Sequence, residues 1–239
     1  MLLYYIRHGD PIYNPDSLTP LGLRQAEAVG RRLCLHGIDE VYVSSSMRAR
    51  QTAQPLCEML KLEPTVLDWA HESHAWEQMA IESNNGKRMW LFAHPDFTEA
   101  LASNEARALG FKWYDHPAFK RYPCIEEGIK RVQNEVDNWL NGFGYAHDHE
   151  KNMYLNSTHN EKRIALFAHQ GFGMAFLSCV LDIPYPVFAT HFDIAHSSMT
   201  VIHFPENEGY CVPKAIQMSN DSHLYKENLP TKYSNRFYI

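Results

Sequence analysis

The feature of this sequence that most constrains its fold is a unit that occurs three times: a short apolar run, a polar loop, and then an amphipathic segment. The apolar runs cover residues 2–6, 40–43 and 163–168. Apolar runs of this length, bounded by turn residues, are typical of buried strands. Strands that alternate with helices indicate a mostly parallel sheet with right-handed crossovers. We therefore expect an α/β fold with this sheet at its centre.

Local signals set the ends of the predicted helices. Thr19 is a typical N-cap and Pro20 a typical first helical residue, while Gly37 supplies a stop. The segment after the second strand has apolar residues at helical spacing, but it contains Pro55. An interior proline costs roughly 3 kcal/mol in a regular helix. We expect this helix to kink at Pro55, or to begin nearer to it than to Met47.

The middle of the chain interrupts the alternation. Residues 70–122 are aromatic-rich and irregular, which predicts a cap inserted into the domain. A long amphipathic helix is predicted over residues 125–140. The polar segment 145–162 indicates an exposed connection. Residues 199–204 can add a strand, and the polar tail from residue 220 is expected on the surface.

Composition agrees with one folded domain over residues 1–239 and argues against several partners. Hydrophobic residues make up 45% of the chain and charged residues 21%, which is typical of a globular protein. The net charge of -6 provides no general attraction to nucleic acid or to an acidic membrane surface. The apolar start is too short for a signal peptide or a membrane span. Five dispersed cysteines without CxxC spacing indicate neither a disulfide framework nor a zinc site, so we expect a cytoplasmic protein.

Polar side chains follow each of the three main predicted strands. Arg7 and His8 follow the first, Arg48 opens the helix after the second, and His169 follows the third. Ligands of open α/β sheets bind beyond the carboxyl ends of the strands, so these side chains are expected to meet. Arginine forks and a helix N-terminus both favour phosphate. Taken singly, each residue is more often a solvated charge or a capping group; their combination favours a phosphoryl ligand.

Four segments in this order resemble the histidine phosphatase superfamily, the phosphoglycerate-mutase-like group of branch 1. They read RHGDPIYN, LTPLGLRQA, SSSMRARQTA and LFAHQG. The correspondence spans residues 1–69 and 163–204, and the cap matches no signature. Asp10 stands where the family commonly has glutamate, and Gln170 where smaller residues are common. The resemblance implies a three-layer α/β/α fold with an inserted cap.

The resemblance also implies a mechanism that uses neither a metal nor another cofactor. Neutral His8 would attack phosphorus and form a phosphohistidine that water then hydrolyses. Arg7, Arg48 and His169 would hold the phosphoryl oxygens through the transfer. Asn14, six residues after His8, would add a neutral donor. The expected activity is hydrolysis of a small phosphomonoester.

An alkoxide leaving group needs a proton, so a protonated carboxylic acid is expected above the site. The family supplies it just after the third strand, where this chain reads VLDWAHESHAWEQ. Glu72, flanked by Trp69 and Trp76, is the candidate for this general acid. The usual glycine after it is missing, and Asp68, Glu77 or a carboxylate of the cap remain alternatives.

Three other functions stay open. A cofactor-dependent phosphoglycerate mutase would need a second anion site, whereas the cap is aromatic rather than basic. A non-catalytic phosphoryl-binding module is a second alternative. The third is a metal-dependent hydrolase, although neither close histidine pair lies on a firmly predicted element with a third ligand in register. Its candidate ligands are His71, His74, His94, His147 and His149. The sequence identifies neither the substrate nor the oligomeric state.

Overall fold

A six-stranded sheet forms the centre of the computed structural model, which describes residues 1–83, 86–233 and 237–238. In sheet order the strands are β13 (Lys214–Asn220), β11 (Met199–His203), β1 (Leu2–Arg7), β10 (Arg163–Ala168), β4 (Glu40–Ser44) and β5 (Thr65–Leu67). Strands β1, β10, β4 and β5 are parallel, while at one edge β11 runs antiparallel to both of its neighbours, β1 and β13. The predicted mostly parallel sheet is confirmed.

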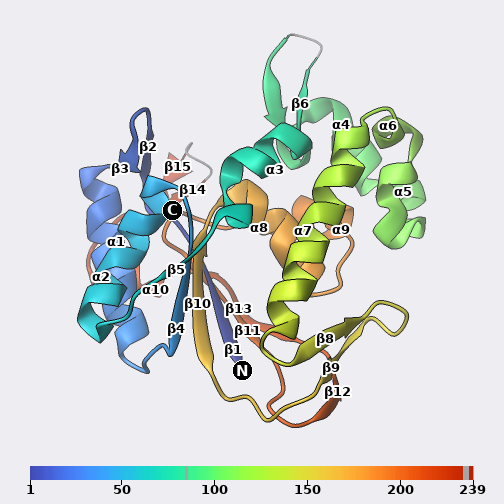
Figure 1. The fold of residues 1–239 in the computed structure, drawn as a ribbon. Coiled ribbons are helices and arrows are strands. Elements are labelled where there is room, and N and C mark those ends of the chain that lie inside the picture. The colour runs from blue at the N-terminus through green and yellow to red at the C-terminus, as the bar shows by residue number, and fades with distance from the viewer. Residues whose placement is uncertain (84–85, 234–236, 239) are drawn as a thin grey trace.

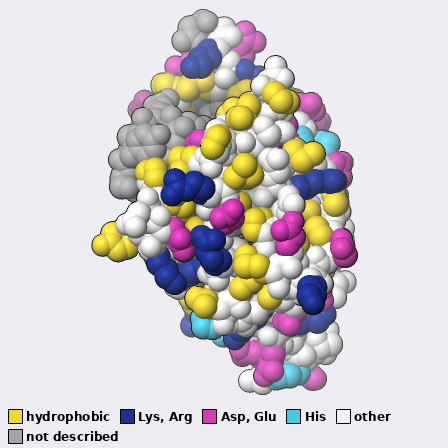
Figure 2. All heavy atoms as spheres, turned by 90° about the vertical axis from the view of Figure 1, so that its left-hand side faces the viewer, with side chains coloured by type: hydrophobic (Ala, Val, Ile, Leu, Met, Phe, Trp, Pro, Cys, Tyr) yellow, Lys and Arg dark blue, Asp and Glu magenta, His cyan; other side chains and the backbone are white. Residues whose placement is uncertain are grey.

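Helices cover both faces of the sheet and complete the three layers (Figure 1). One face carries α1 (Pro20–Cys34) and α2 (Met47–Leu60), and the other carries α7 (Pro123–Asn141), α8 (Gln170–Val180) and α9 (Tyr185–His191). On the face of α1 and α2, Figure 2 shows acidic and basic side chains interspersed. Among the described residues, no helix combines the length and apolar character needed to cross a membrane.

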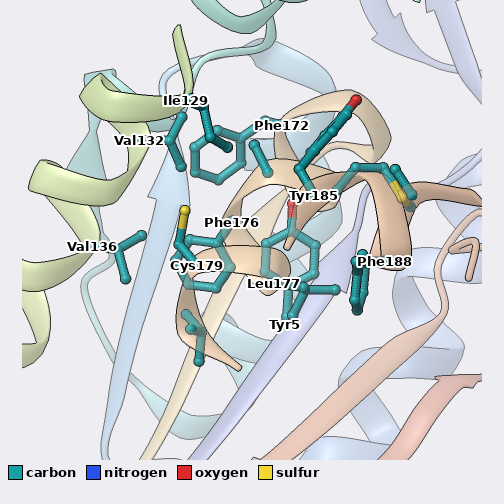
Figure 3. Packing of buried hydrophobic residues seen from close by; sticks show 14 of the residues in the cluster. Tyr5, Ile129, Val132, Val136, Phe172, Phe176, Leu177, Cys179, Tyr185 and Phe188 are labelled. Atoms are coloured by element: carbon teal, nitrogen blue, oxygen red, sulfur yellow. The ribbon is translucent and has the colours of Figure 1, made fainter. Parts of the chain in front are cut away.

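The side chains of β1 alternate between two hydrophobic cores, because successive residues of a strand point to opposite faces. Leu3 and Tyr5 are fully buried in the core under α7 and α8, whereas Ile6 is buried in the core under α1 and α2. Figure 3 shows part of the first core, in which Tyr5 and Phe176 stack with ring centroids 5.2 Å apart. Burial of each such side chain contributes about 1.5–3 kcal/mol. The two cores fix β1, and with it the loop that follows.

Helix α1 begins and ends as predicted, but α2 does not. Thr19 caps α1, and Gly37 adopts a positive φ of 76° in the turn beyond its end. Helix α2 runs over its whole length with Pro55 inside, and Ser46 caps its first turn. The prediction of a start near Pro55 is therefore wrong. Close packing against α1 offsets the proline's missing hydrogen bond: a Cβ added at Gly30 would lie 3.3 Å from Cβ of Pro55.

The segment after β5 forms the cap at the top of Figure 1. Its elements are η1 (Asp68–Ala70), α3 (Glu72–Met79), β6 (Ala80–Glu82), β7 (Arg88–Trp90), η2 (Leu91–Ala93), α4 (Pro95–Ala102), α5 (Asn104–Ala108), η3 (Gly110–Asp115) and α6 (Pro117–Lys120). Trp113 and Phe119 are fully buried within the same core as Leu3. Part of the aromatic content of residues 70–122 therefore serves packing.

The prediction of an exposed connection over residues 145–162 is wrong in part. The strands β8 (Tyr145–Asp148) and β9 (Met153–Asn156) form a hairpin, to which β12 (Gly209–Cys211) adds a third strand. Tyr145 and Tyr154 are fully buried. Such short strands bury only alternate residues, so the segment looks polar on average.

The tail also differs from the predicted surface segment. It contains α10 (Ser222–Lys226), β14 (Lys232–Tyr233) and β15 (Phe237–Tyr238). Leu224 of α10 is fully buried against Ala28 of α1. The tail therefore covers the outer side of α1 rather than only lying in solvent.

Candidate active site

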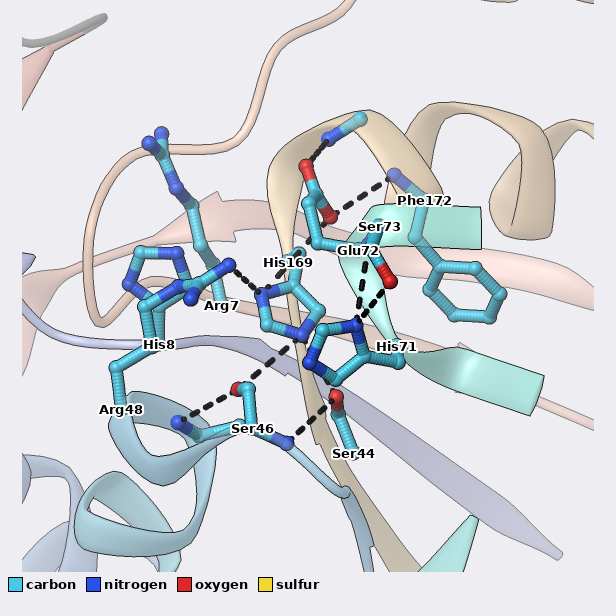
Figure 4. Close-up of polar contacts among 12 residues, drawn as sticks. Arg7, His8, Ser44, Ser46, Arg48, His71, Glu72, Ser73, His169 and Phe172 are labelled. Atoms are coloured by element: carbon cyan, nitrogen blue, oxygen red, sulfur yellow. Dashed lines mark hydrogen bonds and ion pairs between the residues drawn. The ribbon is translucent and has the colours of Figure 1, made fainter. Parts of the chain in front are cut away.

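The candidate site lies at the carboxyl ends of β1, β4 and β10, where the three predicted loops meet (Figure 4). A cavity of about 850 Å³ opens there, and its wall includes Arg7, His8, Arg48 and Glu72. His169 is fully buried beside this wall, with its ring centroid 5.3 Å from that of His8. The structure thus brings these five predicted residues together.

The loop that carries His8 is fixed by both neighbouring helices. The backbone N–H of Gly9 donates to Thr52 Oγ1 of α2 at 3.0 Å, and that of Asp10 donates to Gln25 Oε1 of α1 at 2.8 Å. Gly9 also lies so close to α1 that an added Cβ would be 2.7 Å from the carbonyl oxygen of Gly22. This approach requires glycine, which explains why it follows His8.

His8 has the protonation state that a nucleophile needs. Its Nδ1 lies 2.7 Å from the carbonyl oxygen of Gly9. Because a carbonyl oxygen only accepts, Nδ1 carries the proton, and the neutral ring keeps its lone pair on Nε2. Burial, together with the charges of Arg7 and Arg48, lowers the pKa of His8 well below 6.5. The imidazole is therefore neutral near pH 7 and able to attack phosphorus.

Arg7 is almost fully buried, at 2% exposure, and two contacts fix its guanidinium. Nη1 donates to the carbonyl oxygen of Ile194 at 2.7 Å, and Nη2 donates to His196 Nε2 at 2.7 Å. Its Nε has no hydrogen-bond partner among the described residues. A buried donor of this kind calls for a ligand, and a phosphoryl oxygen is the acceptor that arginine suits best.

Arg48 approaches His8 from the first turn of α2. Its Nη1 lies 2.7 Å from Asp16 Oδ1, and its Nη2 lies 3.2 Å from His169 Nδ1. The Nε of Arg48 also lacks a hydrogen-bond partner within the described part of the chain. Arg7 and Arg48 therefore each bring one unpartnered guanidinium donor to the region of His8.

His169 is held in a single tautomer by its neighbours. An arginine can only donate, so Nδ1 accepts from Arg48, and Nε2 donates to Ser44 Oγ at 2.7 Å. Burial and the nearby His8 and Arg48 lower the pKa of His169 well below 6.5. Both ring nitrogens are thus engaged by the protein. In this geometry His169 positions Arg48, and a direct contact between His169 and phosphate stays a prediction.

Glu72 is the first residue of α3 and lies on the cavity wall, next to the start of α8. Its Oε1 accepts the N–H of Gly171 at 3.0 Å, its Oε2 accepts that of Phe172 at 3.3 Å, and Oε2 lies 3.9 Å from His169 Nδ1. Burial raises the pKa of Glu72, although Arg48 and these two N–H groups oppose the shift. A carboxyl group with a raised pKa beside the nucleophile fits the role of a general acid.

Asn14, which the resemblance assigns to phosphate binding, does not belong to the residues that line the cavity. Asn14 is exposed at the turn between β2 (Pro11–Tyr13) and β3 (Asp16–Leu18), where Tyr13 pairs with Asp16. Tyr13 lines the cavity instead, and its ring lies 5.5 Å from Arg48 Cζ. Strand pairing places Asn14 at the tip of this hairpin.

Sequence reasoning also missed a buried histidine, His196. Its Nε2 accepts from Arg7, its Nδ1 lies 3.7 Å from Asp10 Oδ1, and its ring centroid lies 5.6 Å from that of His8. The segment AHSSMT just before β11 was visible in the sequence, but no spacing rule connects His196 to Arg7. Only the antiparallel pairing of β11 with β1 brings them together.

The cap closes the far side of the cavity with an apolar wall. Trp90 fits tightly over the start of α8, since a Cβ added at Gly171 would lie 2.3 Å from its ring. The aromatic residues of the wall are Trp76, Trp90 and Phe92 from the cap, and Phe192 from the segment after α9. Part of the aromatic content of the cap therefore lines the site.

Two of the candidate metal ligands in the cap serve as helix caps. His71 caps α3 by accepting the N–H of Ser73, and buried His94 caps α4 in the same way. Within the described residues, one group has ligand atoms close enough to surround an ion. It consists of Asp137, His147 and His149.

Comparison with known proteins agrees with this geometry. The family model described as histidine phosphatase superfamily (branch 1) matches residues 3–216. A curated protein of Hydrogenobacter thermophilus, named "Putative phosphoserine phosphatase 2", is 29% identical over 146 residues. The aligned region covers 56% of this chain and 64% of that relative, which is less than two thirds of its length.

Two solved structures have a similar fold across most of the chain. A phosphoserine phosphatase from Entamoeba histolytica, in complex with 3-phosphoglyceric acid, has a TM-score of 0.56 and 17% identity, and the match covers 93% of this chain and 98% of that one. The alpha-ribazole phosphatase from Shigella flexneri has a TM-score of 0.57 and 16% identity, with 92% and 97% covered. At these identities the likeness concerns the fold, and it confirms the predicted phosphoglycerate-mutase-like architecture.

Proposed function

Because the chain belongs to the histidine phosphatase superfamily (branch 1), we propose that it hydrolyses small phosphomonoesters through a covalent phosphohistidine on His8. One observation carries the proposal: a neutral imidazole lies between two buried arginines, Arg7 and Arg48, whose Nε atoms have no hydrogen-bond partner among the described residues. A nucleophile and two donors for the oxygens of phosphate are therefore in place before any substrate binds.

In the first step, Nε2 of His8 forms a bond to phosphorus while the bond from phosphorus to the ester oxygen breaks. Glu72 gives its proton to the departing oxygen, so that an alcohol leaves rather than an alkoxide. The hydrogen bond from Nδ1 to Gly9 stabilises the positive charge that develops on the imidazole. Arg7 and Arg48 keep hold of the phosphoryl oxygens throughout.

In the second step, water attacks the phosphorus of the phosphohistidine. The carboxylate of Glu72, left by the first step, takes a proton from this water as the new bond forms. The bond from phosphorus to His8 breaks, and its electron pair returns to Nε2. Phosphate leaves, and both side chains regain their starting protonation states.

The cavity favours hydrolysis over the mutase reaction. A mutase has to bind a second anionic group during transfer, but Arg7 and Arg48 are the only lysine or arginine side chains on the cavity wall within the described residues. The rest of the wall combines the aromatic side chains of Tyr13, the cap and Phe192 with polar residues, among them the acidic Glu72 and Asp193. A leaving group with an apolar or aromatic part complements that wall better than a second phosphate does.

We also propose that the chain folds as one domain and that it is located in the cytoplasm. We treat residues 1–239 as one domain, because a single hydrophobic core joins Leu3 of the sheet to Phe119 of the cap. The five cysteines are all unpaired, as is usual in a reducing compartment. A cytoplasmic location follows from this proposal.

Turnover of an aryl phosphate in excess chelator tests the activity. The parent should release phosphate at a rate that chelator does not change, it should prefer the aryl ester to phosphoserine, and His8→Ala should be inactive. Turnover that requires added metal ion, or that survives in His8→Ala, would contradict the proposal. If labelled phosphate binds to the parent but no ester is hydrolysed, the binding-module alternative takes its place.

A further inference from the structure

A second group of histidines and aspartates lies away from the cavity. It consists of Asp137 on α7, His147 on β8, His149 just beyond β8 and Asp182 beyond α8, and we call it the hairpin cluster. Figure 1 places β8 near the end of the sheet where the N-terminus lies, whereas the cavity lies beyond the carboxyl ends of the strands. The proposed hydrolysis uses none of these four residues.

The two imidazoles of the hairpin cluster converge on one carboxylate. His147 Nδ1 lies 2.8 Å from Asp137 Oδ1, and His149 Nε2 lies 2.8 Å from Asp137 Oδ2. His147 lies on β8 and His149 in the turn that follows it, so Asp137 on α7 contacts both the strand and the turn. Asp148, between them, instead pairs with Lys151. The three ligand atoms all lie within 4.8 Å of one another.

The second ring nitrogen of His147, Nε2, has a carboxylate partner, as is common for a histidine that binds a metal through its first nitrogen. Its Nε2 lies 2.9 Å and 3.0 Å from the two carboxylate oxygens of Asp182. Tyr154 stacks on the same ring, with centroids 4.2 Å apart and an interplanar angle of 12°. The side chain of His147 is only 1% exposed. A histidine bound to a metal commonly donates its second N–H to a carboxylate in this way.

Without an ion, hydrogen bonds hold the cluster together. An imidazolium of His147 between Asp137 and Asp182 would be a complete ion pair. His149 nevertheless turns its Nε2 to the same carboxylate, and the two ring centroids are only 3.9 Å apart. The Nδ1 of His149 accepts from Gln133 Nε2 at 3.3 Å, so this imidazole is neutral and donates to Asp137 from Nε2. A divalent cation between the three side chains would take the place of the protons that both imidazoles now direct at Asp137.

We propose that Asp137, His147 and His149 bind one divalent transition-metal ion of the zinc class, with Asp182 orienting His147. Two imidazoles and one carboxylate are a ligand set that zinc accepts. Tetrahedral zinc separates neighbouring ligand atoms by about 3.3 Å, so the present contacts must open by about 0.5 Å. His149 can supply this movement, because its side chain is 49% exposed. The ion would tie the β8–β9 hairpin to α7, and its role would be structural.

Zinc titration of the chelator-treated, dialysed protein, against a chromophoric competitor, tests this site. The parent should bind one equivalent of zinc, whereas His149→Ala and Asp137→Asn should not bind it. Asp182→Asn should keep the equivalent but bind it 10- to 100-fold more weakly, since it loses only the orienting carboxylate. His159→Ala is the matched control, because His159 is exposed and lies outside the cluster, paired with Glu161.

A second readout separates loss of the site from loss of the fold. Zinc should raise the melting temperature of the parent and of His159→Ala, but not that of His149→Ala. Substitution with cobalt(II) should give the intense visible absorption of a tetrahedral nitrogen–oxygen site only where zinc binds tightly. If the parent binds no equivalent, or if His149→Ala binds zinc as tightly as the parent does, the inference is wrong.

Discussion

The candidate site and the hairpin cluster both bury a histidine among charged side chains, but the charges have opposite signs. In the site, burial and two arginines lower the pKa of His8 well below its usual value. In the hairpin cluster, burial also lowers the pKa of His147, but hydrogen bonds and charges from two aspartates raise it to about 9. One imidazole is therefore kept neutral, while the other is surrounded by groups that favour positive charge.

This difference assigns a different chemistry to each histidine. A neutral imidazole with a lone pair on Nε2 is a nucleophile, and the arginines that keep His8 neutral also attract the phosphoryl group. Carboxylates around His147 attract a cation instead, whether a proton or a metal ion. The surrounding charges, rather than the residue type, therefore distinguish the catalytic site from the proposed structural one.

The largest predicted effect is a loss of activity that occurs in a variant of the candidate site but not in a variant of the hairpin cluster. His8→Ala should reduce turnover of an aryl phosphate by at least about 10⁴-fold, because no other side chain replaces the attacking nitrogen. His149→Ala should leave kcat within a factor of about two, since the hairpin cluster takes no part in the reaction. Steady-state rates of both variants measure the contrast. Equal losses in the two variants would mean that the groups are coupled and that the comparison fails.

The next effect concerns the proton that the leaving group needs. Glu72→Gln cannot donate, so hydrolysis of an alkyl phosphate should fall by about 10²- to 10³-fold. For a substrate whose leaving group is an acidic phenol, the same substitution should reduce the rate of phosphoenzyme formation much less. Burst kinetics with a series of leaving groups measure this dependence. A loss that is the same for every leaving group would assign Glu72 a binding role instead.

A smaller effect should come from His196, which contacts Arg7 rather than the substrate. His196→Ala should lower kcat/KM by about 10- to 100-fold through misplacement of the guanidinium. His196→Gln, which keeps an acceptor for Arg7, should recover part of the loss. The inhibition constant of inorganic phosphate should weaken in His196→Ala and improve again in His196→Gln. No change in that constant would indicate that His196 only fills space.

The smallest effect is a displacement of the pH profile. His8 has a lowered pKa, so its active neutral form persists below pH 6.5; Glu72 has a raised pKa, so its active protonated form persists above pH 4.5. The kcat for an alkyl phosphate should therefore rise as the pH falls from 8 to 6, by up to about tenfold over this range. Glu72→Gln should abolish this rise. A parent kcat that drops through pH 6.5 would indicate an ordinary histidine.

The catalytic loops could be predicted from the sequence because each is a local pattern. A strand followed directly by Arg7 and His8, or by His169, fixes the end of the sheet to which those side chains belong. The start of α1 is a local pattern too, because Thr19 is its N-cap. What could not be predicted depends on pairing between distant segments. His196 reaches Arg7 only through the pairing of β11 with β1.

The errors have the same origin. Pro55 is tolerated because α2 packs closely on α1, which propensity alone does not reveal. Asn14 was expected as a ligand from the family resemblance, whereas the pairing of Tyr13 with Asp16 places it at an exposed turn. His147 has its partners on two other segments, so its spacing to His149 gave no third ligand.

Trapping the phosphoenzyme tests the central claim most directly. The parent is mixed with a substrate labelled in its phosphoryl group, quenched in alkali within the first turnover, and mapped by mass spectrometry. We expect a label that is stable in base and labile in acid on the peptide containing His8, and no label in His8→Ala. A label on another residue, or a label that persists in His8→Ala, would contradict the account.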